Sequence, residues 1–544
     1  MESSCAERRQ WLLSIGLFSG ALALYALTLT RIHTGDALAY TMAVESGDLR
    51  QLFHPHHLMY NFAGYLFYLL WRSIGWQGRA LLPLQLLNAI VGALGILMFF
   101  AIAKRITRHD TIALISAALL GVSYGYWYYS LEVEVYIIAS FFLLLCFWLT
   151  YNRFQMSSPK SCMLIGLLHG LAILFHQTNV LFIFVVLTAL VLPTKSKRLC
   201  KAIASYLLSL ALSAGLPYLL TGLVINHYSW GSFAHWIIGY AGQRSPSWGH
   251  FGPLSPIKAA IGLGRAIVFN GWLLRSLRYG VSMDLGALAS KMMPTLIIAL
   301  LTIAPILLRF KRISREHPRL TKLCLVWLIS YGLFFTWWQP LNPEFWIASL
   351  IPIWMLFSLS LAWTPSGMAE SSTVSRCSLF VAVILVLVLF LANLTDIRWH
   401  RDPHNDFLAQ MATDIRNRTE QGDLIIFPST SSIYIKYYGR RQNILSLDYV
   451  FDRFSSDKSQ GFAFIDREIA RTLEAGKSVF ISSEEINPSP LRLAEYGLDR
   501  DEVNAFWARY ERRLDPCLVY QNYQKEDWLP AKIKEFTLYQ LQPE

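Results

Sequence analysis

Long apolar runs separated by short polar loops make up the first four hundred residues of the chain. Most of these runs are close to the ~20 residues that a helix needs to cross the hydrocarbon core of a bilayer. Together with the first run, at 11–30, the pattern predicts about eleven membrane-spanning helices. The other runs lie at 80–103, 111–127, 134–151, 161–175, 178–193, 202–224, 292–309, 320–337, 345–362 and 376–394.

Four strongly basic loops follow the second, fourth, sixth and eighth runs. Cytoplasmic loops of membrane proteins carry an excess of Lys and Arg, so we expect all four on the cytoplasmic side. This arrangement puts the N-terminus in the cytoplasm and the C-terminus outside the cell. The basic loops are 104–110, 152–160, 195–201 and 309–322.

Two further apolar segments, 58–71 and 255–285, are not expected to cross the membrane. The first has about fourteen residues, which is short for a span and suits a helix lying in the membrane interface. Counting it as a span would also invert every later basic loop. Charged residues such as Lys258 and Arg265 interrupt the second segment. Both segments are therefore predicted to form helices on the extracytoplasmic surface, and residues 31–79 form the first external loop.

Composition agrees with this class and excludes a soluble protein. Hydrophobic residues make up 54% of the chain, charged residues 15%, and the mean hydropathy is +0.37. The net charge of +12 comes largely from the basic loops, so no nucleic-acid partner is predicted. The run at 11–30 resembles a signal peptide behind Arg8 and Arg9. It is too long, however, and lacks a clear cleavage site, so we expect a retained span.

The last part of the chain is charged and mixed in composition. We expect a transmembrane domain at 1–395 and an extracytoplasmic α/β domain at 396–544, because short strand patterns alternate there with helical ones. Strands are predicted at 423–427, 443–447, 478–482, 517–521 and 536–541, and helices at 403–420 and 458–475.

Two common features are not expected in this domain. No GxGxxG or GxxxxGK[ST] motif stands at a strand–helix junction, so we infer no nucleotide site. Of the seven cysteines, only Cys517 falls in the domain, so it cannot form an internal disulfide.

The first external loop is dense in ionisable residues. A carboxylate at this surface can act as a general base, hold a cation or bind a polar solute. Asp36 follows Gly35 directly after the first span, so it could face a cavity in the helix bundle. Alternatively, Asp36 is the N-cap of a helix that begins at Ala37. The two roles can coexist.

Other candidates stand in predicted outer turns. Glu132 and Glu134 are two residues apart, so on a helix they diverge by about 200° and at most one points inward. Alternatively, both lie in water at the interface. His176 and Gln177 occupy a tight turn, where a lone histidine is more often structural. Glu344 could equally cap the next helix.

Three histidines, His54, His56 and His57, could suggest a metal site. Pro55 breaks the helical spacing between them, and no other His or Cys pattern indicates zinc. We therefore predict no metal ligands and no certain cofactor. A divalent metal at the carboxylates stays open.

The order of these motifs resembles the GT-C superfamily of integral-membrane glycosyltransferases. Its protein O-mannosyltransferase-like and lipid A sugar transferase-like branches are the most similar. The resemblance covers most of residues 1–200 and, more loosely, the C-terminal domain. His56 departs from the pattern, since it stands where the family has a second proline. The matching motifs are "TGDALAY" (34–40), "HPHHLMYNFAGYLFYLL" (54–70), "WQGRALLPLQLLNAIVGALGILMFFAIAKR" (76–105), "SLEVEVY" (130–136) and "LFHQTN" (174–179).

The resemblance implies a GT-C-like fold and a transferase whose donor is a polyprenyl-phosphate-linked sugar, acting on the extracytoplasmic face. By position, Asp36 would be the general base and Glu134 a second acidic residue near the acceptor or the donor phosphate. Direct displacement with one base would invert the anomeric centre. Candidate phosphate ligands are Arg79, Arg244, Arg265 and Arg275. Further substrate contacts are expected from His54, His57, Tyr60, Glu132, Tyr136, His176, Gln177 and Glu344.

Two other classes of protein are alternatives to the glycosyltransferase interpretation. A transporter or lipid flippase without covalent chemistry would place ionisable residues near the bilayer midplane and carry an internal repeat. The sequence shows no repeat. A receptor or scaffold would use the external domain to bind a partner. For the transferase, the expected partners are the bilayer, the lipid-linked donor and a glycan, lipid or protein acceptor, in a bacterial inner membrane.

Overall fold

A computed structural model describes residues 2–152, 158–192, 197–238, 249–269, 285–362, 376–524 and 532–542. The chain forms two compact units. The membrane unit consists of Met1–Thr30, Ala43–Arg278 and Ser282–Arg401. The sheet unit consists of Arg31–Met42, Tyr279–Val281 and Asp402–Glu544. The boundary expected between residues 395 and 396 therefore falls inside one continuous helix, α19.

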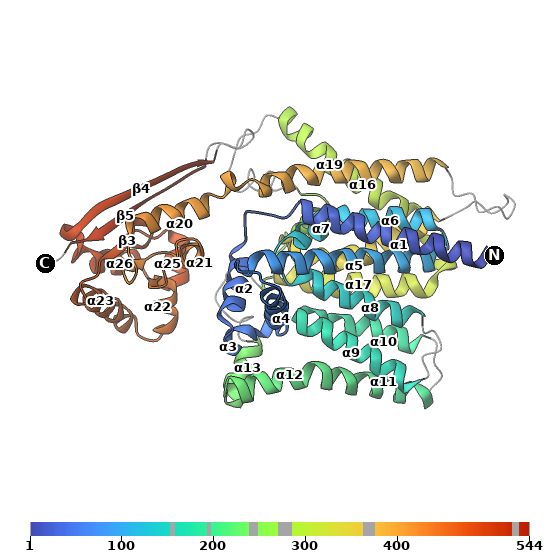
Figure 1. The fold of residues 1–544 in the computed structure, drawn as a ribbon, viewed down its shortest axis with the longest axis horizontal. Coiled ribbons are helices and arrows are strands. Elements are labelled where there is room, and N and C mark those ends of the chain that lie inside the picture. Colours follow the sequence, from blue (N-terminus) through green and yellow to red (C-terminus); the bar gives the residue numbers. More distant parts are fainter. Residues whose placement is uncertain are drawn as a thin grey trace. The chain divides into compact units, whose positions relative to one another are not determined.

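The membrane unit is a bundle of helices that run side by side (Figure 1). Helix α2 (Gly35–Ser46) begins in the sheet unit and ends in the membrane unit. The described helices of the membrane unit are α1 (Glu2–Leu27), α3 (Leu49–Leu52), η1 (Pro55–His57), α4 (Tyr60–Ser73), α5 (Leu81–Thr107), α6 (Asp110–Val122), α7 (Tyr124–Leu131), α8 (Tyr136–Asn152), α9 (Pro159–Phe175), η2 (Gln177–Phe182), α10 (Ile183–Val191), α11 (Lys197–Leu210), η3 (Ala211–Gly215), α12 (Leu216–Leu219), η4 (Leu220–Ile225), α13 (Trp230–Ile238), α14 (Ser255–Ile267), α16 (Leu285–Glu316), α17 (Pro318–Trp338), η6 (Pro343–Trp346), α18 (Ile347–Leu361) and α19 (Arg376–Arg401).

Among the described residues, six helices are long and apolar enough to cross a membrane. The count is seven if α6 and α7, which are bent by 62° at Ser123, form one broken span. The sequence prediction of about eleven spans was higher because it included runs that fold into shorter apolar helices. These are Tyr136–Asn152, Pro159–Phe175 and Gln177–Val191. The remaining predicted run, 292–309, lies in α16, which is not among the candidate spans found in the described residues. The chain is an integral, multi-pass membrane protein.

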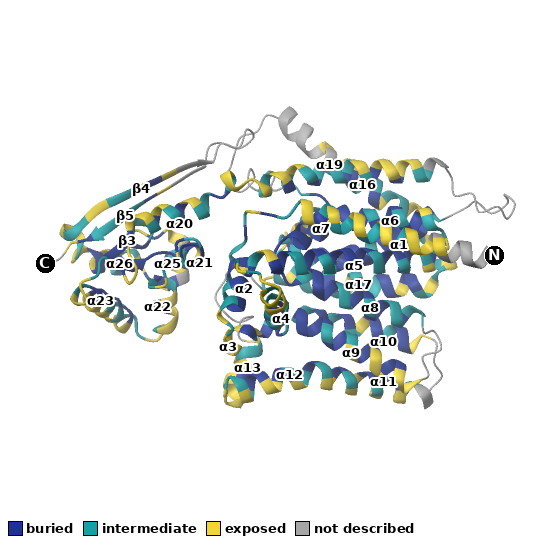
Figure 2. Cartoon of the chain, viewed as in Figure 1, coloured by how far each residue is buried: buried dark blue, intermediate teal, exposed yellow. Residues whose placement is uncertain are grey.

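Burial separates the centre of the bundle from its lipid-facing rim. In the most apolar stretches of α5 and of the span that ends in α18, 56% and 78% of the residues are buried, whereas only 6% are buried in the first span, in α1. Figure 2 shows the same contrast between α5 and the more exposed α11 and α19. Trp127, Trp327 and Trp354 are the largest fully buried side chains and lie in this apolar core.

Helix α4 corresponds to the apolar segment that was expected not to cross. It has 14 residues and is not among the membrane-spanning candidates. Tyr60 and Gly64 are buried, whereas Leu66 and Leu70 are 51% and 57% exposed. This one-sided burial is typical of a helix in the membrane interface. The second such segment begins with α14, and its residues 270–284 lie outside the described part of the chain.

The sheet unit is an α/β domain with its own apolar core. Its five-stranded sheet has the order β2-β1-β3-β5-β4; β2, β1 and β3 are parallel, and β5 and β4 are antiparallel to their neighbours. All five predicted strands are confirmed: β1 (Leu424–Ile426), β2 (Ile444–Leu445), β3 (Val479–Ser482), β4 (Leu514–Gln524) and β5 (Lys532–Leu541). Its helices are η7 (Pro403–Asn405), α20 (Phe407–Arg418), α21 (Ser429–Tyr437), α22 (Leu447–Arg453), α23 (Lys458–Glu474), α24 (Ser483–Ile486), α25 (Pro490–Tyr496), α26 (Arg500–Ala508) and η8 (Glu511–Arg513).

Candidate functional site

Two amide side chains on α5 hold the acidic turn between α7 and α8. The Gln85 side-chain nitrogen donates to the Leu131 carbonyl at 2.8 Å. Asn88, one turn further along α5, donates to the carbonyls of Glu132 and Glu134 at 2.6 and 2.7 Å. Both amides are buried. Because buried carbonyls need hydrogen-bond partners, these bonds fix the path of the backbone through the turn.

Both glutamates of this turn are buried, which corrects two sequence expectations. Glu132 is 0% exposed and Glu134 is 2% exposed, so neither lies in interfacial water. The argument that at most one points inward assumed a helix, but α7 ends at Leu131 and α8 begins at Tyr136. The Glu132 carboxylate accepts from the Thr30 hydroxyl at 3.0 Å and from the Val133 backbone N–H at 2.8 Å. The Glu132 side chain therefore stabilises the turn through these two hydrogen bonds.

Glu134 and Glu344 each lie near a tyrosine of a neighbouring helix. Burial, and then the negative charge of Glu134, raise the pKa of Tyr60 well above its usual value of 10. The Tyr60 hydroxyl also accepts from the Asn88 amide at 3.4 Å. Tyr129 donates to the Glu344 carboxylate at 3.0 Å. Two glutamates far apart in the sequence, Glu134 and Glu344, are thus each placed beside a tyrosine.

His176, Tyr136 and Glu344 line a narrow cleft. The imidazole of His176 lies 4.8 Å from the Tyr136 ring, measured between centroids. Its Nδ1 is 2.6 Å from the Thr178 hydroxyl, as expected for a structural histidine. Burial, and then the neighbouring His56, lower the pKa of His176 to about 3, so the ring is neutral at pH 7. Asn342 donates to Glu344 at 2.7 Å and orients its carboxylate.

The histidines of segment 31–79, which was predicted to be the first external loop, pack against this region. The rings of His54 and His57 stack at 4.5 Å, and His57 meets Tyr60 edge to face at 6.2 Å. The backbone of Met59 donates to Leu174 at 2.9 Å, which joins the loop to the turn before His176. Burial, followed by the charges of neighbouring histidines including His176, lowers the pKa of His57 well below 6.5. Among the described residues, no group of three or more His, Cys, Asp or Glu could hold a metal ion.

Asp36 stands in the first turn of α2, and the N-cap interpretation is wrong. Thr34 fills that role, since its hydroxyl accepts from the Ala37 backbone N–H at 3.0 Å. The segment is anchored in the sheet unit, where Tyr434 donates to the His33 carbonyl at 3.3 Å. The Asp36 side chain remains exposed, yet desolvation by surrounding protein atoms raises the pKa of its carboxyl above 3.8. The Asp36 carboxylate is therefore accessible from outside the protein, as its proposed catalytic role requires.

The arginines proposed for phosphate binding have different surroundings. Arg79 pairs with Glu45 at 2.6 Å, so its guanidinium is held by a carboxylate on α2. Arg265 donates to the Leu341 carbonyl at 2.8 Å. Arg244 and Arg275 lie outside the described residues. Gln177, which was proposed to contact substrate, donates to Ile237 at 3.4 Å.

The membrane unit thus brings together most of its own candidate residues. The candidates that lie around the acidic turn and the cleft beside His176 are Glu132, Glu134, Tyr60, Tyr136, His57, His176 and Glu344. Sequence reasoning missed Gln85, Asn88 and Tyr129. The signal for the amides was present, because Gln85 and Asn88 are polar, three residues apart and surrounded by an apolar run.

Comparisons with known proteins agree with this architecture. The sequence model of a family described as dolichyl-phosphate-mannose-protein mannosyltransferase matches residues 58–220, less than a third of the chain. The crystal structure of ArnT from Cupriavidus metallidurans bound to undecaprenyl phosphate is 12% identical. Its TM-score is 0.57, and the match covers 98% of this chain and 99% of that chain. The apo structure of the same protein is 10% identical with a TM-score of 0.58, covering 99% and 100%.

The matches to solved structures show the fold of the chain. The whole-length likeness confirms the predicted GT-C fold, that of a polytopic membrane protein with a C-terminal domain. No curated protein matches the sequence.

Proposed function

We propose that the chain is a membrane glycosyltransferase that moves a sugar from a polyprenyl-phosphate-linked donor to an acceptor hydroxyl. The observation that carries this proposal is the cluster of buried carboxylates, tyrosines and neutral histidines at one end of a GT-C bundle. Such a cluster offers many hydrogen-bonding groups to a sugar. The likeness to a structure that holds undecaprenyl phosphate supports the choice of donor lipid.

Asp36 acts as the general base in this proposal. The acceptor oxygen forms a bond to the anomeric carbon while the bond from that carbon to the phosphate oxygen breaks. The hydroxyl proton passes to the Asp36 carboxylate, and polyprenyl phosphate leaves with the electron pair. Direct displacement inverts the anomeric centre. A carboxyl with a raised pKa holds the transferred proton more firmly than an ordinary aspartate does.

The other side chains position substrates. Glu134 serves as a second acidic residue that orients a sugar or acceptor hydroxyl. His57 and His176 are uncharged at pH 7, so each can donate and accept a hydrogen bond without attracting an anion. Arg79, Arg244, Arg265 and Arg275 are the proposed sources of phosphate contacts, because the planar guanidinium matches the phosphate oxygens. The reaction takes place on the extracytoplasmic face of a bacterial inner membrane.

Purified full-length protein tests the proposal directly. Labelled polyprenyl-phosphate hexoses and pentoses are incubated with the protein and a membrane extract that supplies acceptors. We expect label to move to a lipid, glycan or protein while polyprenyl phosphate is released. Movement of the donor lipid across vesicle bilayers with no transfer of label would instead support a transporter or flippase.

The base assignment has its own variant and control. Asp36→Asn keeps the size of the side chain but cannot accept the proton, so we expect transfer to fall at least ~100-fold, the usual effect of a lost general base. Asp48→Asn is the matched control, because Asp48 is an exposed carboxylate in the same loop that caps α3. Thermal unfolding should be similar in both variants. Transfer by Asp36→Asn within twofold of the unaltered protein would exclude Asp36 as the base.

A further inference from the structure

A second cavity lies between α1, α5 and α8, away from the candidate site. Its volume is about 750 Å³, within the range of ligand sites. Its lining residues along α5 and at the C-cap of this helix run from Leu94 to Arg108, whereas Asn88 marks the candidate site. Lys104 is sixteen residues from Asn88 along this helix, a separation of roughly 24 Å at 1.5 Å per residue. The basic end of the cavity and the acidic turn therefore lie toward opposite membrane surfaces.

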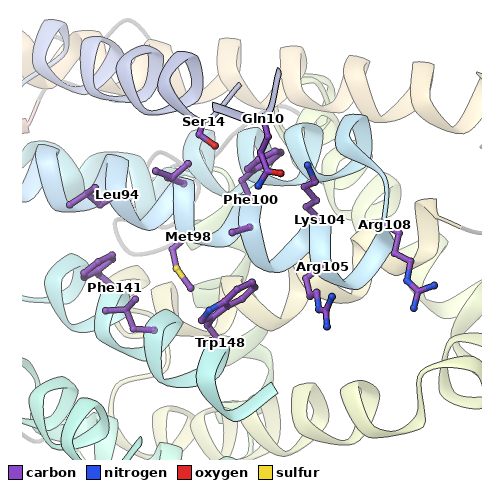
Figure 3. Close-up of a pocket in the computed structure, with 13 residues that line it drawn as sticks. Gln10, Ser14, Leu94, Met98, Phe100, Lys104, Arg105, Arg108, Phe141 and Trp148 are labelled. Atoms are coloured by element: carbon purple, nitrogen blue, oxygen red, sulfur yellow. The ribbon is translucent and has the colours of Figure 1, made fainter. Parts of the chain in front are cut away.

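The walls of this cavity change from apolar to basic along α5. Figure 3 shows Met98 of α5 pointing toward Trp148 of α8, with Phe141 further from the basic end. Gln10 and Ser14 of α1 add a polar edge near Lys104. The apolar wall is completed by Leu94, Leu97, Phe100, Ala101 and Leu145.

Three cations gather at the other end of the cavity. Lys104 pairs with Asp110 at 2.9 Å, which balances one of them. Arg105 and Arg108 are exposed side chains at the end of α5. Arg108 adopts φ 57° at the C-cap, where its backbone N–H donates to Lys104 at 2.8 Å. This left-handed turn ends the helix at the mouth of an apolar cavity, where Arg105 and Arg108 form no ion pair with any residue that the structure describes.

We propose that this cavity binds an anionic phospholipid of the cytoplasmic leaflet. One acyl chain lies against Met98 and Phe141, the ester groups face Gln10 and Ser14, and the phosphate meets Arg105 and Arg108. The change from apolar through polar to basic walls matches an amphiphile with an anionic headgroup. Trp148 lines the cavity, and tryptophan is a residue type favoured near the headgroup boundary. Arg pairs with phosphate through two parallel hydrogen bonds. This site is independent of the proposed transferase chemistry.

Native mass spectrometry of the delipidated full-length protein tests the headgroup. Phosphatidylglycerol and phosphatidylcholine with identical acyl chains are titrated in turn. We expect phosphatidylglycerol to bind at least tenfold more tightly. The double variant Arg105→Gln/Arg108→Gln should lose that preference and bind both lipids alike. Lys311→Gln/Arg315→Gln removes the same charge from exposed positions on α16 and should keep the preference.

A second variant tests the cavity itself. Ala101→Trp fills the apolar wall without changing charge, so it should weaken both lipids at least tenfold. Ala101→Leu is the milder replacement if the tryptophan variant does not fold. Equal binding of the two lipids by the unaltered protein would overturn the proposal. So would a preference that survives in Arg105→Gln/Arg108→Gln, or polyprenyl phosphate displacing phosphatidylglycerol from this site at equal concentration.

Discussion

The side chain of Asn88 decides the geometry of the acidic turn. It satisfies two buried carbonyls at once, those of Glu132 and Glu134. Replacing Asn88 with Leu keeps the approximate size but leaves both carbonyls without this donor. Each buried unsatisfied group costs about 1–3 kcal/mol, so we expect a loss of roughly 2 kcal/mol or more in the free energy of unfolding.

Thermal unfolding in detergent measures this loss, together with transfer activity, which should also fall. Asn504→Leu is the control, because Asn504 is an exposed position on α26. A melting temperature unchanged in Asn88→Leu would show that the turn does not depend on this amide.

Buried neutral histidines predict a pH dependence of stability. The pKa of His176 is about 3 in the folded protein, against about 6.5 in an unfolded chain. Below pH 6.5 the unfolded state therefore binds more protons than the folded state, and the free energy of unfolding falls as the pH falls. His57, with a pKa also lowered by burial, adds to the same trend.

Melting temperatures at pH 7.5, 6.5 and 5.5 measure this slope. The variant His176→Gln removes one titrating group and should give a shallower slope than the unaltered protein. His404→Gln, at an exposed histidine of η7, is the matched control for the substitution itself. Equal slopes in His176→Gln and the unaltered protein would contradict the assignment.

For single residues, the sequence predicted which side chains belong to the candidate site better than it predicted their conformation. It indicated Glu134, His176 and Glu344 as candidates, and the structure places them in one region, since His176 and Glu344 line one cleft and both glutamates act on Tyr129. It failed for Glu132 because the argument assumed a helix, whereas α7 ends at Leu131 and α8 begins at Tyr136. The bonds from Asn88 and Thr30 that hold it extended join residues 44 and 102 positions apart. Local sequence carries no direct trace of such contacts.

At the scale of elements, strands and interface helices were the most predictable. Each strand of the sheet unit is a short apolar run between turn residues, so composition alone located it. Helix α4 was separable from the spans by its length, and because counting it as a span would invert every later basic loop. The bend between α6 and α7 was not foreseen, since the run at 111–127 reads as one continuous apolar segment.

Packing of α14 depends on one glycine. A Cβ atom at Gly262 would clash with the Pro340 carbonyl oxygen and lie 2.7 Å from the Trp346 indole nitrogen. Those two atoms are themselves hydrogen-bonded at 3.0 Å, in the loop that carries Glu344. We therefore expect Gly262→Ala to displace this loop, with a destabilisation of about 1–3 kcal/mol and reduced transfer.

The same helix provides the control. A Cβ at Gly264 would meet nothing within 4 Å, so Gly264→Ala should be neutral or slightly stabilising through helix propensity. Both variants are compared by thermal unfolding and by activity. Similar melting temperatures for the two would refute the close approach of α14 to the loop.

At the scale of the whole molecule, the basic loops predict which end of the bundle faces the cytoplasm. Leu49, in the first external loop, and the native Cys200, at the start of α11, are both exposed. In spheroplasts, a membrane-impermeant maleimide should label Leu49→Cys. Cys200 should react only after permeabilisation.

A Cys517→Ser background removes the other accessible thiol expected outside. Cys200→Ser shows that the second signal comes from the intended residue. Labelling of Cys200 in sealed spheroplasts would invert the predicted topology and with it the face on which the proposed reaction occurs.

The pairing of Glu45 with Arg79 closes the first external loop at its base, where the Glu45 carboxylate also accepts from the Ala80 backbone N–H at 3.0 Å. Exposed ion pairs contribute little to overall stability, so this contact matters as a tether rather than as a source of folding energy. The intervening stretch, with η1 and α4, becomes a ring whose two ends stay together. The two ends can therefore separate only if both this ion pair and the hydrogen bond to Ala80 break.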